Sequence, residues 1–324
     1  MAGSPRLFLI DGHSLAYRTY FALTGAGGPE RWLTRAGEPT AGTYGFTSVL
    51  LRLLEQESPD YLAVSFDTGR TFRDDLYPEY KATRDKSPED LKAQLDRIRQ
   101  VVSAFGIPIL EAEGYEADDV LGTVARRAAE LGVHTVILTG DRDLLQLAGP
   151  NTTIRLAGQK LSEAVDYGPE EVEARFGVTP AQFVDYKALV GDTSDNIPGV
   201  RGIGEKTALG LLQSYGSLEG IYGHLAEVPT RFRTRLADGR PSADLSRRLS
   251  AIATDVPLAF DLEACRGRAF DRDRVVELFR DLEFRSLLDR LPDAESPAAS
   301  RQLPMFASAA VRPIPALVRT QVVA

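Results

Sequence analysis

The chain of 324 residues carries 38 lysines and arginines against 46 aspartates and glutamates, a formal net charge of −8 that argues against an ordinary nucleic-acid binder. Hydrophobic residues make up 43% of it, as in a globular protein with a substantial core, and no apolar run approaches the ~18–20 residues of a membrane-spanning helix. The short apolar run before Asp11 does not resemble a secretory signal, so we expect a cytoplasmic protein without a membrane partner. The single cysteine, Cys265, excludes an intramolecular disulfide framework and a cysteine zinc cluster.

Three short apolar segments, each followed or ended by an aspartate, predict strands of a parallel sheet. They are residues 6–11, 61–67 and 134–141. Between them, residues 88–106 and 116–132 carry apolar residues at helical spacing. Strands that alternate with helices predict an α/β fold. The carboxyl ends of parallel strands share one edge of a sheet, so we expect Asp11, Asp67 and Asp141 to meet there.

The composition divides the chain into three parts. We predict an α/β core over residues 1–198, which includes an irregular aromatic and basic segment at about 68–87. A helical region follows at 199–291, with glycines at its start. Residues 292–324 contain five prolines and few large apolar residues, so we expect a flexible tail.

Nine acids from five segments have the spacing of a metal site. They are Asp11, Asp67, Glu116, Asp118, Asp119, Asp141, Asp143, Asp192 and Asp195. Hard divalent cations take oxygen ligands, and two ions ~3.5–4 Å apart can clamp the attacking and leaving oxygens of a phosphodiester. Any one of these acids also has a structural explanation, as a helix N-terminal charge or a turn residue. Their repetition at successive strand–helix junctions favours a site for two Mg²⁺ ions, for which Mn²⁺ can substitute.

A glycine-rich segment at 199–212 has the pattern of the hairpin in a helix-hairpin-helix motif. Gly199, Gly202 and Gly204 precede a helix start that carries Lys206 and Thr207. Small residues let a DNA backbone approach, and the amides of the following helix can bind phosphate. The alternative is a generic glycine turn between two helices.

The segment 72–86 combines cations with aromatic residues. Its candidates are Arg73, Tyr77, Tyr80, Lys81 and Arg84. Arginines and lysines would take phosphates and tyrosines would stack on bases in a passage for single-stranded nucleic acid. A solvated loop is an equal alternative, because nearby acids almost cancel the charge.

Six segments occur in an order that closely resembles the bacterial and phage 5′-nuclease family. They are LIDGHSLAYR, FRDDLYPEYKATR, GYEADDVLGTVA, LTGDRDLLQL, DYKALVGDTSDNIPGVRGIGEKTA and LEFRSLL. This family of flap-endonuclease-like 5′→3′ exonucleases includes the N-terminal domain of bacterial DNA polymerase I, and the resemblance covers roughly residues 6–291. It implies a parallel-sheet, PIN-like α/β nuclease core with a helical arch at about 68–87 and a C-terminal helix-hairpin-helix region. All nine acids fall on positions where the family has metal-site carboxylates.

The resemblance also implies roles for single residues. Arg18 matches an arginine that faces the scissile phosphate, and Tyr80, Lys81 and Arg84 match arch residues, with Lys81 as an electrophilic helper. Asp67 and Asp118 would hold one Mg²⁺, and Asp118, Asp141 and Asp143 the second, with the other acids acting mainly through water. The hairpin matches a duplex anchor that can hold K⁺ on backbone carbonyls. Expected substrates are DNA with 5′ flaps, nicks or free 5′ ends, and RNA primers annealed to DNA.

Two further segments suggest partners. Residues Gln302, Leu303, Met305 and Phe306 resemble the short peptide with which bacterial replication proteins bind the sliding clamp; random apolar residues in a linker are the alternative. Trp32, the only tryptophan, lies in a segment that is several residues longer than in the polymerase-type members of the family it resembles. It either packs as a wedge at the flap junction or covers the base of its own loop.

Three other functions stay open on sequence alone. The chain could be a non-catalytic DNA-junction binding module, the nuclease domain of a larger DNA polymerase I, or a PIN-like ribonuclease. The complete acid set argues against the first and the DNA-type hairpin against the last. We expect a monomer by default.

Overall fold

The computed structural model describes residues 4–25, 27–84, 87–157, 164–266 and 270–292. Its centre is a six-stranded sheet with the order β3-β2-β1-β4-β5-β6. The strands are β1 (Arg6–Asp11), β2 (Tyr61–Ser65), β3 (Ile109–Leu110), β4 (His134–Thr139), β5 (Thr152–Leu156) and β6 (Val165–Tyr167). All pairs are parallel except β5 with β6. The three predicted strands are confirmed as neighbours in the middle of this sheet.

The helices are numbered in chain order. They are α1 (Gly12–Thr24), α2 (Ala41–Glu57), α3 (Phe72–Leu76), α4 (Glu89–Ala104), α5 (Ala117–Glu130), α6 (Pro169–Phe176), α7 (Pro180–Val190), α8 (Glu205–Tyr215), α9 (Leu218–Gly223), α10 (Thr230–Ser250), α11 (Arg272–Asp281) and α12 (Arg285–Leu288). Short 3₁₀ turns are η1 (Pro29–Trp32), η2 (Asp143–Leu147) and η4 (Glu263–Cys265). The helices predicted at 88–106 and 116–132 are confirmed as α4 and α5. None of the helices in the described ranges is long and apolar enough to cross a membrane.

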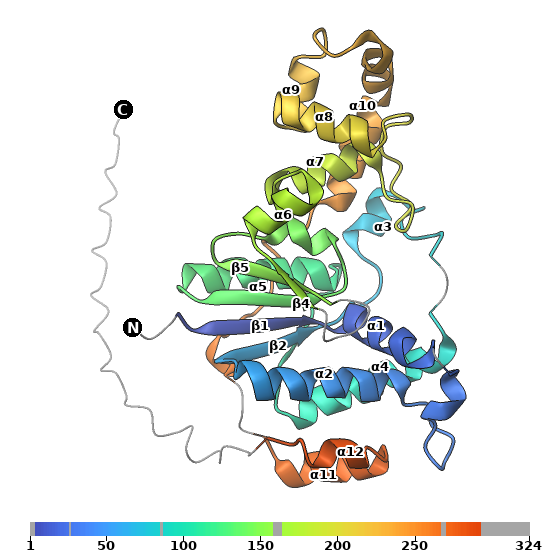
Figure 1. The fold of residues 1–324 in the computed structure, drawn as a ribbon, viewed down its shortest axis with the longest axis vertical. Coiled ribbons are helices and arrows are strands. Elements are labelled where there is room, and N and C mark those ends of the chain that lie inside the picture. The colour runs from blue at the N-terminus through green and yellow to red at the C-terminus, as the bar shows by residue number, and fades with distance from the viewer. Residues whose placement is uncertain (1–3, 26, 85–86, 158–163, 267–269, 293–324) are drawn as a thin grey trace, which may run out of the picture.

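The central strand β1 is apolar on both faces, as a strand covered on two sides must be. Leu7 and Leu9 pack into one cluster with the apolar face of α5. Phe8 and Ile10 point the other way, into a second cluster with residues of α1, α2 and α4. Figure 1 shows the corresponding layers, with α5 on one side of the sheet and α2 and α4 on the other. The two-residue side-chain period of a strand therefore builds both cores.

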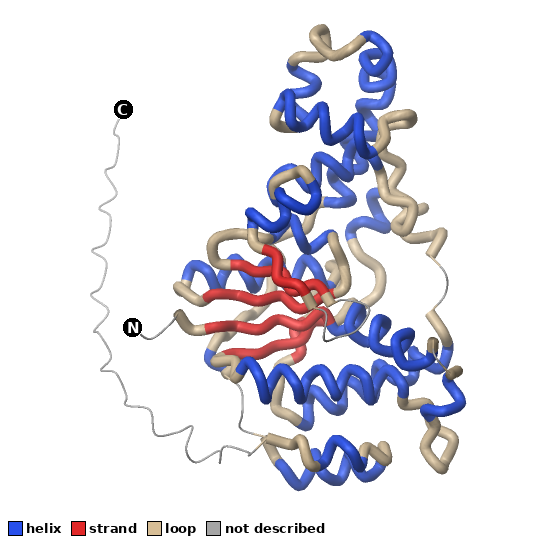
Figure 2. Tube along the Cα trace, viewed as in Figure 1, coloured by secondary structure: helices blue, strands red, loops and turns tan. Residues whose placement is uncertain are grey.

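The segment predicted as a helical arch contains less helix than expected. Only α3 is helical, and a capping box between Thr71 and Asp74 starts it. Consecutive turns follow over 78–83 (Figure 2), and residues 85–86 lie outside the described ranges. In Figure 1 the residues that follow α3 lie on the right-hand side of the molecule, the side toward which the carboxyl ends of β1 and β4 point.

The helical region after the core occupies two places. Helices α7 to α10 form the upper end of the molecule in Figure 1, whereas α11 and α12 lie at the lower end. Phe279 of α11 is fully buried and contacts Phe105 at a ring-centroid distance of 6.1 Å. Residues 270–291 therefore pack against the core rather than with α8 to α10.

Candidate active site at the carboxyl edge of the sheet

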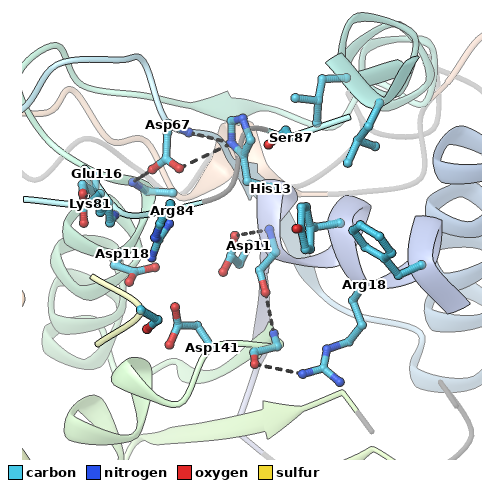
Figure 3. Close-up of a pocket in the computed structure, with 18 of the residues that line it drawn as sticks. Asp11, His13, Arg18, Asp67, Lys81, Arg84, Ser87, Glu116, Asp118 and Asp141 are labelled. Carbon is cyan, nitrogen blue, oxygen red and sulfur yellow. Dashed lines mark hydrogen bonds and ion pairs between the residues drawn. The ribbon is translucent and has the colours of Figure 1, made fainter. Parts of the chain in front are cut away.

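A cavity of about 1330 Å³ opens where β1, β2 and β4 end. Its charged lining consists of Asp11, Asp67, Glu116, Asp118, Asp141, His13, Arg18, Lys81 and Arg84. Figure 3 shows Asp11, Asp118 and Asp141 pointing into the same space, with Lys81 and Arg84 on one side and Arg18 on another. Five of the nine predicted acids and three of the predicted cations thus share one cavity.

Asp11 occupies the junction between β1 and α1. Its carboxylate accepts a hydrogen bond from the backbone N–H of Ser14 at 3.0 Å, which caps α1, and another from the hydroxyl of Thr139 at 2.8 Å. Burial, together with the charges of Asp67 and Asp141, raises the pKa of Asp11 to about 7 despite these hydrogen bonds. The end of β1 and the end of β4 are therefore joined through this one carboxylate.

Asp67 joins the end of β2 to the start of α5. One of its oxygens accepts the N–H of Ala117 at 2.8 Å, and its own N–H is donated to Nδ1 of His13 at 3.0 Å. The sequence analysis did not single out His13. Its position two residues after Asp11, in the turn that enters α1, was the available signal.

The acids in the cavity lie close enough together to repel one another when they are charged. Burial raises the pKa of Asp118 well above its usual value, and the charges of Asp141, Asp11, Glu116 and Asp67 add to that rise. Carboxylates that crowd together resist ionisation. A hard divalent cation stabilises their ionised form, and water completes its coordination. As the side chains stand, no three His, Cys, Asp or Glu residues in the described part of the chain surround a single ion. In chemistry, though not in their present positions, these oxygen donors therefore suit a divalent cation.

Asp119 was predicted as a metal-site acid, but the structure gives it another partner. Its side chain is 0% exposed and accepts two hydrogen bonds from the Arg73 guanidinium, at 2.7 and 2.8 Å. It also accepts the N–H groups of Glu116 and Ala253. Its oxygens are therefore engaged inside the protein, and we remove Asp119 from the metal set.

Arg73 was predicted to contact nucleic acid, but the structure buries it together with Asp119. Its side chain is 2% exposed, because Asp119 and the carbonyl groups of Leu249 and Ala251 surround the guanidinium. A buried guanidinium cannot contact a phosphate. Tyr80, also expected to face DNA, is 6% exposed, and its hydroxyl points to Glu116 and Asp195 at 3.3 and 3.4 Å.

Lys187 is a buried cation that the sequence analysis missed. Its ammonium donates to both oxygens of Asp143 and lies 2.7 Å from Asp192. Burial raises the pKa of Asp143 to about 6 in spite of Lys187. At Asp192 burial also raises the pKa, but Lys187 and the hydrogen bonds from Ser194 together outweigh it and lower the pKa to about 2. A lysine in the turn of helix just before the GDTSD segment was the only signal in the sequence.

Lys81 and Arg84, the cations of the segment predicted as an arch, form ion pairs with two of the predicted acids. Nζ of Lys81 lies 2.5 Å from Glu116, and the guanidinium of Arg84 pairs with Asp195. The backbone N–H of Lys81 donates to the carbonyl of Asp195 at 2.9 Å. Arg18, across the cavity, donates to the carbonyl of Gly140 at 3.1 Å. The segment 80–84 is thus held against the cavity by charged contacts that phosphates or cations can exchange.

The glycine hairpin lies between α7 and α8, away from the cavity. Gly202, Gly204 and Lys206 are exposed and Thr207 is half-buried. Gly199 is buried, has φ of +62°, and an added Cβ would lie 2.4 Å from the backbone N of Gly191. Its role is therefore to allow close backbone packing rather than to contact DNA.

Two remaining predicted features lie elsewhere. Trp32 is half-buried, packs against Tyr44 with tilted rings at a centroid distance of 5.0 Å and donates its indole N–H to the carbonyl of Leu23 at 3.2 Å. These contacts are those of a loop that covers its own base. The peptide with Gln302, Leu303, Met305 and Phe306 lies outside the described residues.

Comparisons with known proteins agree with this architecture. Residues 6–177 match the family model of the 5′-3′ exonuclease N-terminal resolvase-like domain. Residues 178–273 match that of the 5′-3′ exonuclease C-terminal SAM fold. The two models meet between residues 177 and 178, before α7, whereas the sequence analysis set its boundary at 198/199.

Curated relatives are DNA polymerases I. The chain is 48% identical to that of Chloroflexus aurantiacus over 307 residues, which cover 93% of this chain and 32% of the relative. It is 46% identical to that of Caldicellulosiruptor bescii, over 88% of this chain and 33% of the relative. The chain therefore spans about a third of the length of these relatives.

Solved structures share the fold. A T5 5′-exonuclease with bound divalent zinc ions aligns with a TM-score of 0.60 at 22% identity, covering 86% of this chain and 98% of that one. The catalytic core of Rad2 in complex with a DNA substrate aligns with a TM-score of 0.53 at 17% identity, over 86% and 87% of the two chains. The two family models, which together span residues 6–273, show that the chain belongs to the 5′-3′ exonuclease family.

Proposed function

We propose that this chain is a metal-dependent, structure-selective 5′-nuclease that hydrolyses phosphodiesters of DNA at 5′ flaps, nicks and free 5′ ends. The observation that carries the proposal is one cavity in which five carboxylates face three cations that come from two distant segments. Acids that repel one another beside cations that can contact a phosphate suit phosphoryl chemistry. RNA primers annealed to DNA are a second substrate of the same class.

The acids in the cavity would hold the metal. Asp11, Asp67, Glu116, Asp118 and Asp141 supply the oxygens, and Mg²⁺ is the proposed ion, with Mn²⁺ as substitute. When bound, such ions polarise the phosphoryl oxygens and lower the pKa of water. Asp143, Asp192 and Asp195 are paired with Lys187 and Arg84, so we propose that they act from a distance by fixing these two cations.

The chain's own cations would then position and stabilise the phosphate. Lys81 and Arg84 can leave Glu116 and Asp195 for phosphoryl oxygens, since all four groups line or border the cavity. Arg18 approaches from α1, on the opposite side. Hydrogen-bond donors directed at developing negative charge contribute most of such a rate enhancement.

Duplex DNA would rest on the hairpin between α7 and α8. Its exposed Gly202 and Gly204 let a phosphate backbone approach, and Lys206 adds charge. We also propose K⁺ on the hairpin carbonyls, which an affinity for duplex that is higher in KCl than in LiCl at equal ionic strength would support.

The test is cleavage of a 5′-flap DNA labelled at its 3′ end, with and without Mg²⁺. We expect metal-dependent cuts near the junction that Asp67→Ala abolishes and Lys81→Ala slows. Asp96→Ala is the matched control, because Asp96 is an exposed acid of α4 outside the cavity lining. Tight flap binding without cutting in Mg²⁺ or Mn²⁺ would leave only the junction-binding module, and cutting of RNA alone would favour the ribonuclease.

The finer statements about partners are also proposals. We propose a cytoplasmic monomer that the tail peptide recruits to a sliding clamp. Light scattering after size exclusion tests the monomer. Pull-down with a bacterial clamp, with Phe306→Ala as the control, tests the recruitment.

A further inference from the structure

One face of α10 supports the hairpin. Arg235, Gly239, Ser242 and Ser246 are four, three and four residues apart, so they share one side of the helix. Each of them meets the segment 199–202. In Figure 1 the loop between α7 and α8 accordingly runs beside α10.

The serines hold Gly199. Its N–H is donated to Oγ of Ser246 at 2.9 Å, and its carbonyl accepts the hydroxyl of Ser242 at 2.7 Å. Gly239 gives the room for this contact, since a Cβ there would lie 2.7 Å from Cγ1 of Val200. Buried backbone groups need such partners, so α10 dictates the conformation of the hairpin.

Arg235 reaches the exposed tip of the hairpin. Its Nη1 donates to the carbonyl of Gly202 at 2.9 Å. The guanidinium lies close to Gly202, because a Cβ added there would be 3.0 Å from Nη1 and 3.2 Å from Cζ. In the described part of the chain Arg235 has no carboxylate partner. Its side chain is exposed next to the hairpin tip, and Lys206 lies at the start of α8, directly after the hairpin.

A guanidinium offers five N–H donors in a planar fork that matches phosphate. One donor is committed to Gly202, which fixes the side chain and lowers the entropy lost when the others bind a ligand. We propose that Arg235 is a duplex-anchoring residue that both holds the hairpin tip through Gly202 and binds a DNA phosphate beside Lys206. This inference rests on the proposed action of the chain on DNA.

The test compares Arg235→Ala with Arg240→Ala. Both remove one arginine from an exposed position of α10, but Arg240 lies over Tyr222, away from the hairpin. Affinity for a labelled blunt duplex, without divalent metal, is measured by fluorescence anisotropy over a series of salt concentrations. We expect Arg235→Ala to weaken binding about tenfold and to reduce the salt slope by about one, whereas Arg240→Ala matches the wild type. On a flap substrate in Mg²⁺, Arg235→Ala should raise KM and leave kcat unchanged.

Two further variants separate the two roles of Arg235. Arg235→Lys keeps the charge and loses the fork, so it should restore the salt slope but not the full affinity. Ser242→Ala removes a hydrogen bond to Gly199 without a change of charge, so it should weaken duplex binding at an unchanged salt slope. Thermal unfolding of each variant checks that it folds.

The outcomes distinguish this inference from the proposed function. Wild-type cleavage in Mg²⁺, combined with an Arg235→Ala variant that has wild-type affinity and salt slope, would overturn the inference alone. Wild-type affinity in Arg235→Lys would overturn the hairpin-holding role. A wild type that neither cuts flaps nor binds duplex would overturn both the inference and the proposed function.

Discussion

Arg73 and Asp119 form a bidentate ion pair in the interior, with N–O distances of 2.7 and 2.8 Å. The same guanidinium donates to the carbonyls of Leu249 and Ala251, at 2.8 and 2.7 Å. Arg73 belongs to α3, Asp119 to the first turn of α5, and the carbonyls to the end of α10 and the residue after it. The Arg73 side chain therefore links α3 and the end of α10 to the first turn of α5, next to Glu116 and Asp118.

Loss of either partner of this pair should destabilise the fold. We expect Arg73→Met and Asp119→Asn each to lower the free energy of unfolding by about 3–5 kcal/mol, because the remaining partner is left buried and unpaired. The double variant should lose less than the sum. Urea unfolding of the wild type, the two single variants and the double variant measures this coupling. Losses in the free energy of unfolding that are additive, or smaller than about 1 kcal/mol, would contradict it.

The metal-free protein should lose stability as the pH rises. Burial raises the pKa of Asp11 from 3.8 to about 7, so the folded state binds more protons than the unfolded state between these values. The free energy of unfolding therefore falls over this window and is lowest above pH 7.

Asp11→Asn removes that titration and keeps an oxygen for Ser14. In chelator at pH 8 it should be more stable than the wild type, by at most about 4 kcal/mol, and the difference should vanish below pH 4. Mg²⁺ should stabilise the wild type more than the variant. Equal pH profiles for the two proteins would refute the assignment.

Lys81 should matter for turnover more than for binding. Lys81→Met removes a cation that faces the cavity, and we expect single-turnover flap cleavage to slow by roughly 10²–10³-fold with little change in flap affinity. Lys92→Met, an exposed lysine of α4 that pairs with Glu89, serves as the control. Equal slowing in both variants would show a general charge effect instead.

Two hairpin glycines should respond differently to alanine. Gly199→Ala places a Cβ against the backbone of Val190 and Gly191 at positive φ, so we expect a loss of stability of about 2–3 kcal/mol. Gly204→Ala meets nothing within 4 Å and should keep its stability, while its methyl group hinders the approach of a phosphate backbone. Thermal unfolding and duplex binding, measured on both, check this; wild-type duplex affinity in Gly204→Ala would exclude contact at that residue.

Trp32 should report on folding rather than on DNA. As the only tryptophan, it dominates the fluorescence, and its contacts with Tyr44 and Leu23 are lost on unfolding. We expect an emission shift in urea and none on addition of flap DNA. Trp32→Ala should cost about 3 kcal/mol of stability and leave kcat on a flap substrate unchanged. Quenching by DNA would favour the wedge interpretation.

The strongest local patterns of the sequence predicted the frame of the site. The runs that end at Asp11, Asp67 and Asp141 are typical of strands that are covered on both faces of a parallel sheet. Parallel pairing then brings their carboxyl ends to one edge, and the cavity lies there. Strand β3, with two residues, and β6, with three, are too short for a period to show.

Tertiary structure alone decided which partner each acid has. Asp118 and Asp119 are neighbours in the same first turn, yet one lines the cavity and the other is sealed against Arg73, 46 residues away in sequence. Asp143 and Asp192 have the spacing of metal ligands in the sequence. The structure shows that both of them pair with Lys187. The charge state and the reach of a carboxylate depend on which cation lies within hydrogen-bond distance and on how much water remains around it. Both are set by contacts between distant segments, so spacing along the chain identifies the acids but not their partners.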